Sequence, residues 1–97
     1  MRHQYRQKRR VIAPALNPAA IGRRVRAARK ARGWRQLDLS MKTGIHPSVV
    51  GLYETGDRVP TRDAGFALCV ALRRSLEWLY FGVQRNGKIW KMGEYDD

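Results

Sequence analysis

The chain has 97 residues, enough for one small domain with its own hydrophobic core. A hydrophobic content of 43% excludes a wholly disordered chain, and no apolar run approaches the roughly 18 residues of a membrane-spanning helix. Lys and Arg number 20 against 8 Asp and Glu, so the formal net charge of +12 predicts a polyanionic partner, nucleic acid ahead of an anionic membrane. A soluble basic protein without such a partner is the alternative interpretation.

The N-terminal residues 1–16 are predicted to form a basic, flexible arm. Within it, MRHQYRQKRR carries many cations, no acid and no hydrophobic period, and it lacks the apolar stretch of a secretion signal. The single cysteine of the chain, Cys69, cannot form an internal disulfide, and its apolar neighbours indicate a small core residue. These features predict a cytoplasmic, nucleoid-associated protein.

A helical pattern begins at residue 17. Asn17 suits the N-cap, Pro18 suits the first helical position, and Gly33 ends the segment. The apolar face of this helix consists of Ile21, Val25 and Ala28. The basic residues that lie mostly off this face are Arg23, Arg24, Arg26, Lys30 and Arg32. A charge run of this kind predicts a solvated face, from which some side chains could reach a nucleic-acid backbone.

Two shorter helices follow. The segment RQLDLSMKTG places Leu39 toward the core, and Gly44 can take the left-handed conformation that ends a helix. The segment HPSVVGLYETG directs Val50 and Tyr53 inward and ends at Gly56. The tight turn at Gly44 therefore joins two helices, which is the arrangement that a helix-turn-helix requires.

Two further helices are predicted before the C-terminal segment. TRDAGFALCVALR begins at the cap candidate Thr61, although Gly65 inside it weakens the helix prediction. The residues expected to be buried are Phe66, Leu68, Cys69 and Leu72. Ser75 caps LEWLYF, which ends at Gly82. The aromatic side chains of this region, including Trp90, are either core or part of a dimer surface.

The last segment, residues 83–97, has the pattern of a β-hairpin and not of a helix. Asn86-Gly87 is the dipeptide favoured in a two-residue hairpin turn, and apolar residues flank it, so a short C-terminal β-hairpin is expected. The acidic tail GEYDD either stays solvated or folds back on the basic surface. The predicted fold class is thus all-α, a five-helix domain over residues 17–82 between an arm and this hairpin.

The run from Ile21 to Gly82 resembles the phage-repressor and Cro-like helix-turn-helix family, also described as xenobiotic-response-element-type regulators. The matching residues are Ile21, Gly22, Val25, Arg29, Gly33, Gln36, Leu39, Gly44, Val50, Glu54, Gly56, Pro60, Leu68 to Leu72 and the closing SLEWLYFG. The resemblance implies a five-helix repressor-like domain, a DNA-binding transcriptional regulator and a structural ion pair between Arg29 and Glu54.

By the same resemblance, the helix over residues 46–55 enters the major groove of double-stranded DNA. The positions that face base edges are Pro47, Ser48, Gly51 and Leu52. The usual glutamine, asparagine and arginine readers are absent there, which favours shape fit and apolar contact with a thymine methyl. The phosphate-contacting candidates are Gln36 by the resemblance, His46 at the helix cap, and the flanking cations Arg35, Lys42, Arg58 and Arg62.

The arm has two interpretations. Arg6, Arg9 and Arg10 either reach into an A·T-rich minor groove or add only non-specific attraction to DNA. No catalytic or metal-ligand constellation is apparent, because His3 and His46 are far apart and lack nearby cysteines or paired acids. We therefore expect no enzymatic activity, no cofactor and no metal.

The leading functional hypothesis is a sequence-specific transcriptional regulator, a repressor of phage, prophage or bacterial origin, that binds as a homodimer. The second is an antitoxin-like or other protein-interaction module that keeps the helix-turn-helix as a scaffold and binds a protein partner. A third is an architectural or RNA-binding basic protein, whose affinity would not depend on sequence. The fold alone does not separate the three.

Overall fold

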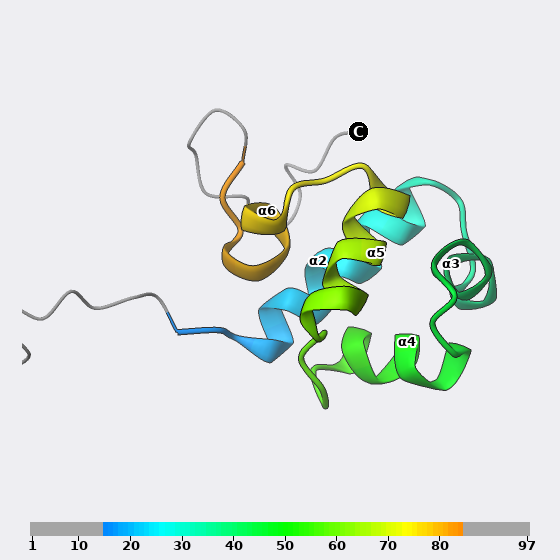
Figure 1. The fold of residues 1–97 in the computed structure, drawn as a ribbon, viewed down its shortest axis with the longest axis horizontal. Helices are drawn as coiled ribbons and strands as arrows, with labels where there is room; N and C mark the ends of the chain where they lie inside the picture. The colour runs from blue at the N-terminus through cyan, green and yellow to red at the C-terminus, as the bar shows by residue number, and fades with distance from the viewer. Residues whose placement is uncertain (1–14, 85–97) are drawn as a thin grey trace, which may run out of the picture.

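The computed structural model describes residues 15–84, and helices make up most of this part (Figure 1). They are α2 Pro18–Ala31, α3 Gln36–Thr43, α4 Pro47–Thr55, α5 Arg62–Leu72 and α6 Leu76–Phe81. The all-α, five-helix prediction is confirmed for these residues. The hairpin predicted around Asn86 and Gly87, the acidic tail and residues 1–14 of the arm lie outside the described residues.

The ends of the helices are set by local chemistry that the sequence already displays. Three of the predicted N-caps each accept a hydrogen bond from the backbone N–H three residues later, at 3.0–3.2 Å: Asn17, Thr61 and Ser75. The glycines that end α3, α4 and α6 have φ of 79°, 86° and 74°, a region that a side chain disfavours. Each of these helix ends is therefore fixed by its own residues.

The hydrophobic core draws side chains from all five helices. It consists of Ile21, Val25, Ala28, Leu39, Val50, Tyr53, Leu68, Cys69, Leu72, Trp78 and Leu79. Trp78 is 1% exposed, so the largest aromatic side chain of α6 belongs to the core rather than to a dimer surface. Tyr80 is half-buried and its hydroxyl donates to the carbonyl oxygens of Pro60 and Thr61, both at 3.0 Å.

The prediction that Phe66 is buried was wrong. Phe66 is 61% exposed, because on a helix with 100° per residue it lies well away from the face shared by Leu68, Cys69 and Leu72. Gly65 is on that face instead and is buried, and a Cβ there would lie 2.9 Å from Cζ of Tyr80. The glycine that weakened the helix prediction thus allows α6 to pack closely on α5.

The prediction of a solvated basic face on α2 was wrong for two of its residues. Arg24 is 7% exposed, and its Nε and Nη2 donate to the Leu79 carbonyl oxygen at 3.1 and 2.7 Å. Arg32 is half-buried and its Nη2 donates to the Leu72 carbonyl oxygen at 2.8 Å. Both carbonyls lie in last helical turns, which lack intrahelical partners and carry partial negative charge. Burial, together with the charge of Arg23, lowers the pKa of Arg24.

A close contact joins α2 to α4. Gly22 is buried, and a Cβ at this position would lie 2.5 Å from the Tyr53 carbonyl oxygen, a backbone atom that cannot move alone. The backbone of α2 therefore rests directly on the last turn of α4.

None of the helices between residues 15 and 84 is both long and apolar enough to cross a membrane.

Candidate nucleic-acid interface

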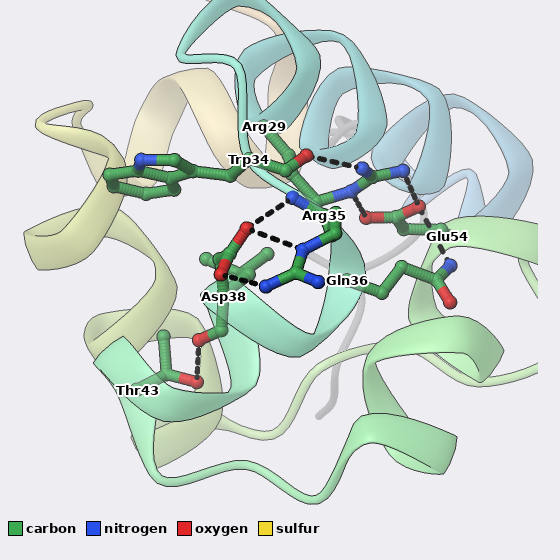
Figure 2. Close-up of polar contacts among 8 residues, drawn as sticks. Arg29, Trp34, Arg35, Gln36, Asp38, Thr43 and Glu54 are labelled. Carbon is green, nitrogen blue, oxygen red and sulfur yellow. Dashed lines mark hydrogen bonds and ion pairs between the residues drawn. The ribbon is translucent and has the colours of Figure 1, made fainter.

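A polar network holds α4 against the rest of the domain (Figure 2). Arg29 Nε and Nη2 donate to the two carboxylate oxygens of Glu54 at 2.7 and 2.9 Å. Arg29 Nη1 donates to the Trp34 carbonyl oxygen at 2.7 Å, and Gln36 Nε2 donates to Glu54 Oε1 at 3.1 Å. The Glu54 carboxylate thus links α4 to α2 and to the start of α3, while Arg29 also binds the α2–α3 loop.

The charge pair at the centre of this network lies in the interior. The exposed fractions of the Arg29 and Glu54 side chains are 9% and 3%. A bidentate guanidinium–carboxylate pair has a defined geometry and is stronger when water is excluded. Removal of one partner would leave the other charge buried and unpaired, which is costly. The expected ion pair is therefore present and holds α4 at a fixed angle to α2.

The turn between α3 and α4 is closed by short-range hydrogen bonds. The Ser40 hydroxyl donates to the Ile45 carbonyl oxygen, and Thr43 Oγ1 donates to the Leu39 carbonyl oxygen at 2.8 Å. The Ile45 backbone N–H donates in turn to Thr43 Oγ1 at 3.2 Å. The left-handed Gly44 completes this turn, so the angle between α3 and α4 has little freedom.

The outward face of α4, defined as Pro47, Ser48, Gly51 and Leu52, is weakly polar. Ser48 is exposed and the other three residues are half-buried. Gly51 has open space above it: a Cβ there would have only the Gln36 side-chain amide, at 3.9 Å, as a neighbour. This face can come close to another surface because no side chain projects from its centre.

The cap of α4 engages both a backbone and a side-chain group. His46 Nδ1 accepts a hydrogen bond from the Ser48 backbone N–H at 3.1 Å and lies 2.8 Å from Ser48 Oγ. With Nδ1 as acceptor for the backbone N–H, the neutral ring carries its proton on Nε2. The imidazole is thereby held beside the first turn of α4, with Nε2–H as the remaining donor.

Cations surround the α3–α4 unit. Arg35 and Asp38 pair at the start of α3, with Nη2 to Oδ1 at 3.1 Å and the Arg35 backbone N–H to Oδ2 at 2.7 Å. The hydrogen bonds from Arg35 lower the pKa of Asp38, and the hydrogen bond to Asp38 raises the pKa of Arg35. Lys42 Nζ lies 4.8 Å from the centre of the Trp34 ring. Both cations remain largely exposed beside the turn unit.

Other predicted contacts are farther from the turn unit along the chain. Arg58 and Arg62 are exposed in the segment after α4 and at the first residue of α5. The arm residues Arg6, Arg9 and Arg10 lie outside the described residues.

The sequence did not indicate a role for Trp34. Its carbonyl oxygen accepts a hydrogen bond from Arg29 and its ring lies beside Lys42, and neither contact produces a recognisable residue spacing. No group of three or more metal-binding side chains occurs among residues 15–84.

Comparisons with known proteins identify the family. Residues 25–79, more than half of the chain, match the helix-turn-helix family. The chain belongs to this family, and its similarities place it in the phage-repressor and Cro-like branch. The predicted class is thereby confirmed: this is a DNA-binding transcriptional regulator of the Cro/C1 type.

Solved structures agree in fold. The P22 c2 repressor in complex with a synthetic operator is 31% identical, with a TM-score of 0.63 over 64% of this chain and 94% of that one. The restriction-modification controller protein C.AhdI from Aeromonas hydrophila is 31% identical, with a TM-score of 0.61 over the same shares. The DNA-binding domain of the P22 c2 repressor in solution is 25% identical, with a TM-score of 0.64 over 82% and 100%.

A curated relative is eukaryotic. Multiprotein-bridging factor 1 from Schizosaccharomyces pombe is 32% identical over 53 residues, which are 55% of this chain and 36% of the relative. The chain thus spans little more than a third of the length of this relative. The similarity therefore does not extend over the whole of the larger protein.

Proposed function

We propose that this protein is a sequence-specific repressor that places α4 in the major groove of an operator. The observation that carries the proposal is the buried Arg29–Glu54 pair with its hydrogen bond from Gln36, because these contacts hold α3 and α4 at one angle. A recognition helix with a fixed direction can meet the groove without a large ordering cost. The P22 c2 repressor, similar in sequence and fold, is described in complex with an operator.

The outward face of α4 would read bases by fit more than by hydrogen bonding. The Ser48 hydroxyl can donate to or accept from a base, and Leu52 can pack on a thymine methyl. Gly51 leaves space for the helix backbone to come close to the base edges. We therefore expect modest discrimination per base pair, with a preference for thymine opposite Leu52.

Affinity would come from phosphates. The proposed contacts are Arg35, Gln36, Lys42, His46, Arg58 and Arg62, with Arg6, Arg9 and Arg10 of the arm in the minor groove. Gln36 is the first residue of α3, where unpaired backbone N–H groups also favour an anion. Each neutralised phosphate releases counterions, so binding should weaken steeply as salt rises.

Dimerisation would supply the remaining specificity. Two copies on an inverted repeat combine two modest half-site affinities into one strong interaction. A soluble regulator of this kind would act in the cytoplasm, on the nucleoid of a bacterium or on phage DNA. We propose no enzymatic activity, in line with the DNA-binding character of the family.

Selection from a random duplex library, followed by fluorescence anisotropy, tests the proposal. Selected and scrambled duplexes are titrated with the full chain across a salt series. The selected duplex should bind about 10³-fold or more tightly near physiological salt. Equal affinities for both duplexes, collapsing together with salt, would contradict a sequence-specific repressor and leave only charge-driven binding.

A protein-interaction module is the second candidate function. The outer side of α3 exposes apolar side chains where a helix that crosses phosphates would carry polar ones: Leu37 is 47% and Met41 75% exposed. One similar protein is named a multiprotein-bridging factor. This candidate gains if the anisotropy experiment finds no sequence preference while Met41→Glu abolishes capture of a protein partner.

A further inference from the structure

The outer face of α5 carries an apolar pair between opposite charges. Phe66 and Val70, one helical turn apart, are 61% and 62% exposed. Asp63 and Arg73 are exposed beyond them on the same side of the helix, one toward each end. Large apolar side chains that cluster in water usually mark a contact surface. We call these four residues the α5 face.

The positions of the α5 face are symmetric about Leu68. Phe66 and Val70 lie two residues before and after it, and Asp63 and Arg73 lie five before and after it. A two-fold axis across the middle of α5 would pair it with an antiparallel copy in which each residue meets its mirror position. Phe66 would then meet Val70 of the second copy, and Asp63 would meet Arg73.

We propose that the α5 face is the surface through which two copies of this chain associate. The proposal rests on the dimer in the proposed function and names its interface. The apolar pairs would lie at the centre, and a Phe and a Val buried from each copy provide the attraction. The two Asp–Arg pairs would lie at the rim, about 7.5 Å along the axis from Leu68, where they set the antiparallel register.

The α5 face contains no residue of the α3–α4 unit. Figure 1 shows α4 along the lower edge of the molecule, with α5 above it and in front of α2. The α6 surface suggested by the sequence is a weaker candidate, since Trp78 is buried and the Tyr80 hydroxyl is bonded to the Pro60 and Thr61 carbonyl oxygens. A dimer through the α5 face would use no residue of α4.

Sedimentation equilibrium of the full chain without DNA tests the proposal. Phe66→Glu should raise the dimer dissociation constant by about tenfold or more. The matched control is Phe81→Glu, because Phe81 is 43% exposed on α6, the alternative surface, and its replacement should leave the constant unchanged. Both variants should melt near the parent temperature, since neither side chain is in the core.

A charge exchange tests the register. Asp63→Arg and Arg73→Asp should each weaken association, because like charges would then meet across the axis. The double variant should regain affinity, since every contact is again between opposite charges. Aspartate also tolerates the left-handed backbone of residue 73, where φ is 58°.

Three results would overturn the proposal: a parent chain that stays monomeric, unchanged association of Phe66→Glu, or a double variant weaker than both single ones. Anisotropy on the selected duplex separates this failure from failure of the proposed function. Dimerisation without sequence-specific binding would contradict the repressor alone. Specific binding by a monomer that shows no cooperativity would contradict the α5 face alone.

Discussion

On its inward side, α4 carries Val50, Tyr53 and Glu54, which are 0%, 4% and 8% exposed. On its outward side, the exposed Ser48 and the half-buried Leu52 flank a glycine with open space above it. The inward side is specified by close contacts and a buried charge pair. The outward side has few constraints from the fold. Stability and recognition are therefore assigned to different faces of one helix and should respond to different substitutions.

The largest effect should come from breaking the inward charge pair. Glu54→Gln leaves the Arg29 guanidinium buried without a carboxylate, and we expect the free energy of unfolding to fall by about 3–5 kcal/mol. Urea unfolding followed by circular dichroism measures it. The control is the double variant Arg29→Met, Glu54→Leu, which should recover part of the loss because no charge is stranded. A single variant as stable as the parent would show that the pair is not required.

Two glycines of the α2–α4 region provide a matched comparison. Gly22→Ala should cost about 1–3 kcal/mol, because its Cβ would meet backbone oxygens of α4. Gly51→Ala should instead stabilise the domain by about 0.5–1 kcal/mol, because alanine favours the helix and the nearest atom is 3.9 Å away. The same methyl group should weaken operator binding if α4 approaches bases closely. Thermal melts and anisotropy give the two readings, and equal effects of both substitutions on stability would contradict the comparison.

Outward substitutions should alter DNA binding and spare the fold. Ser48→Ala should reduce discrimination at one base pair by about 0.5–1.5 kcal/mol, the worth of one hydrogen bond, with stability changed by about 0.5 kcal/mol or less. Arg58→Ala, as the phosphate counterpart, should weaken binding to all duplexes alike and lower the salt slope by about one. Anisotropy on single-base variants of the selected duplex distinguishes the two. A uniform loss for Ser48→Ala would place this residue on the phosphates instead.

The smallest expected signal is the reactivity of Cys69. Burial, with a further contribution from the Glu77 charge, raises the pKa of its thiol from 9.0 to about 11. The thiol should therefore resist alkylation at pH 8, and labelling should report opening of the interior. We expect faster labelling in Glu54→Gln than in the parent, and an unchanged rate in Ser48→Ala. Because the pKa of the Cys69 thiol is higher in the folded state, the stabilisation that comes from keeping this thiol protonated is complete below pH 9. It is lost as the pH rises toward 11.

Local features of the sequence were sufficient for the helix ends. The caps Asn17, Thr61 and Ser75 act on backbone groups three residues away, and glycines at positive φ mark the ends of three helices. Their partners are near in sequence, so type and spacing suffice. The family resemblance extended this to the Arg29–Glu54 pair, which spans 25 residues.

Local pattern failed where the partner is remote or the helical register is decisive. Phe66 is as apolar as its neighbours, and only its angle on α5 places it in solvent. Arg24 looks like a surface cation, yet its acceptor is a carbonyl oxygen 55 residues away. A backbone carbonyl has no sequence signature, so no spacing rule could have found it.

The sequence by itself determined that this chain forms helices with defined ends, carries an excess of positive charge and belongs with helix-turn-helix regulators. The tertiary structure alone decided which arginines are buried, which glycines permit close helix contacts and which apolar residues remain exposed on α5. The physical reason is the range of the interactions. Caps and turns involve groups a few residues apart, whereas burial and packing depend on which distant segments meet.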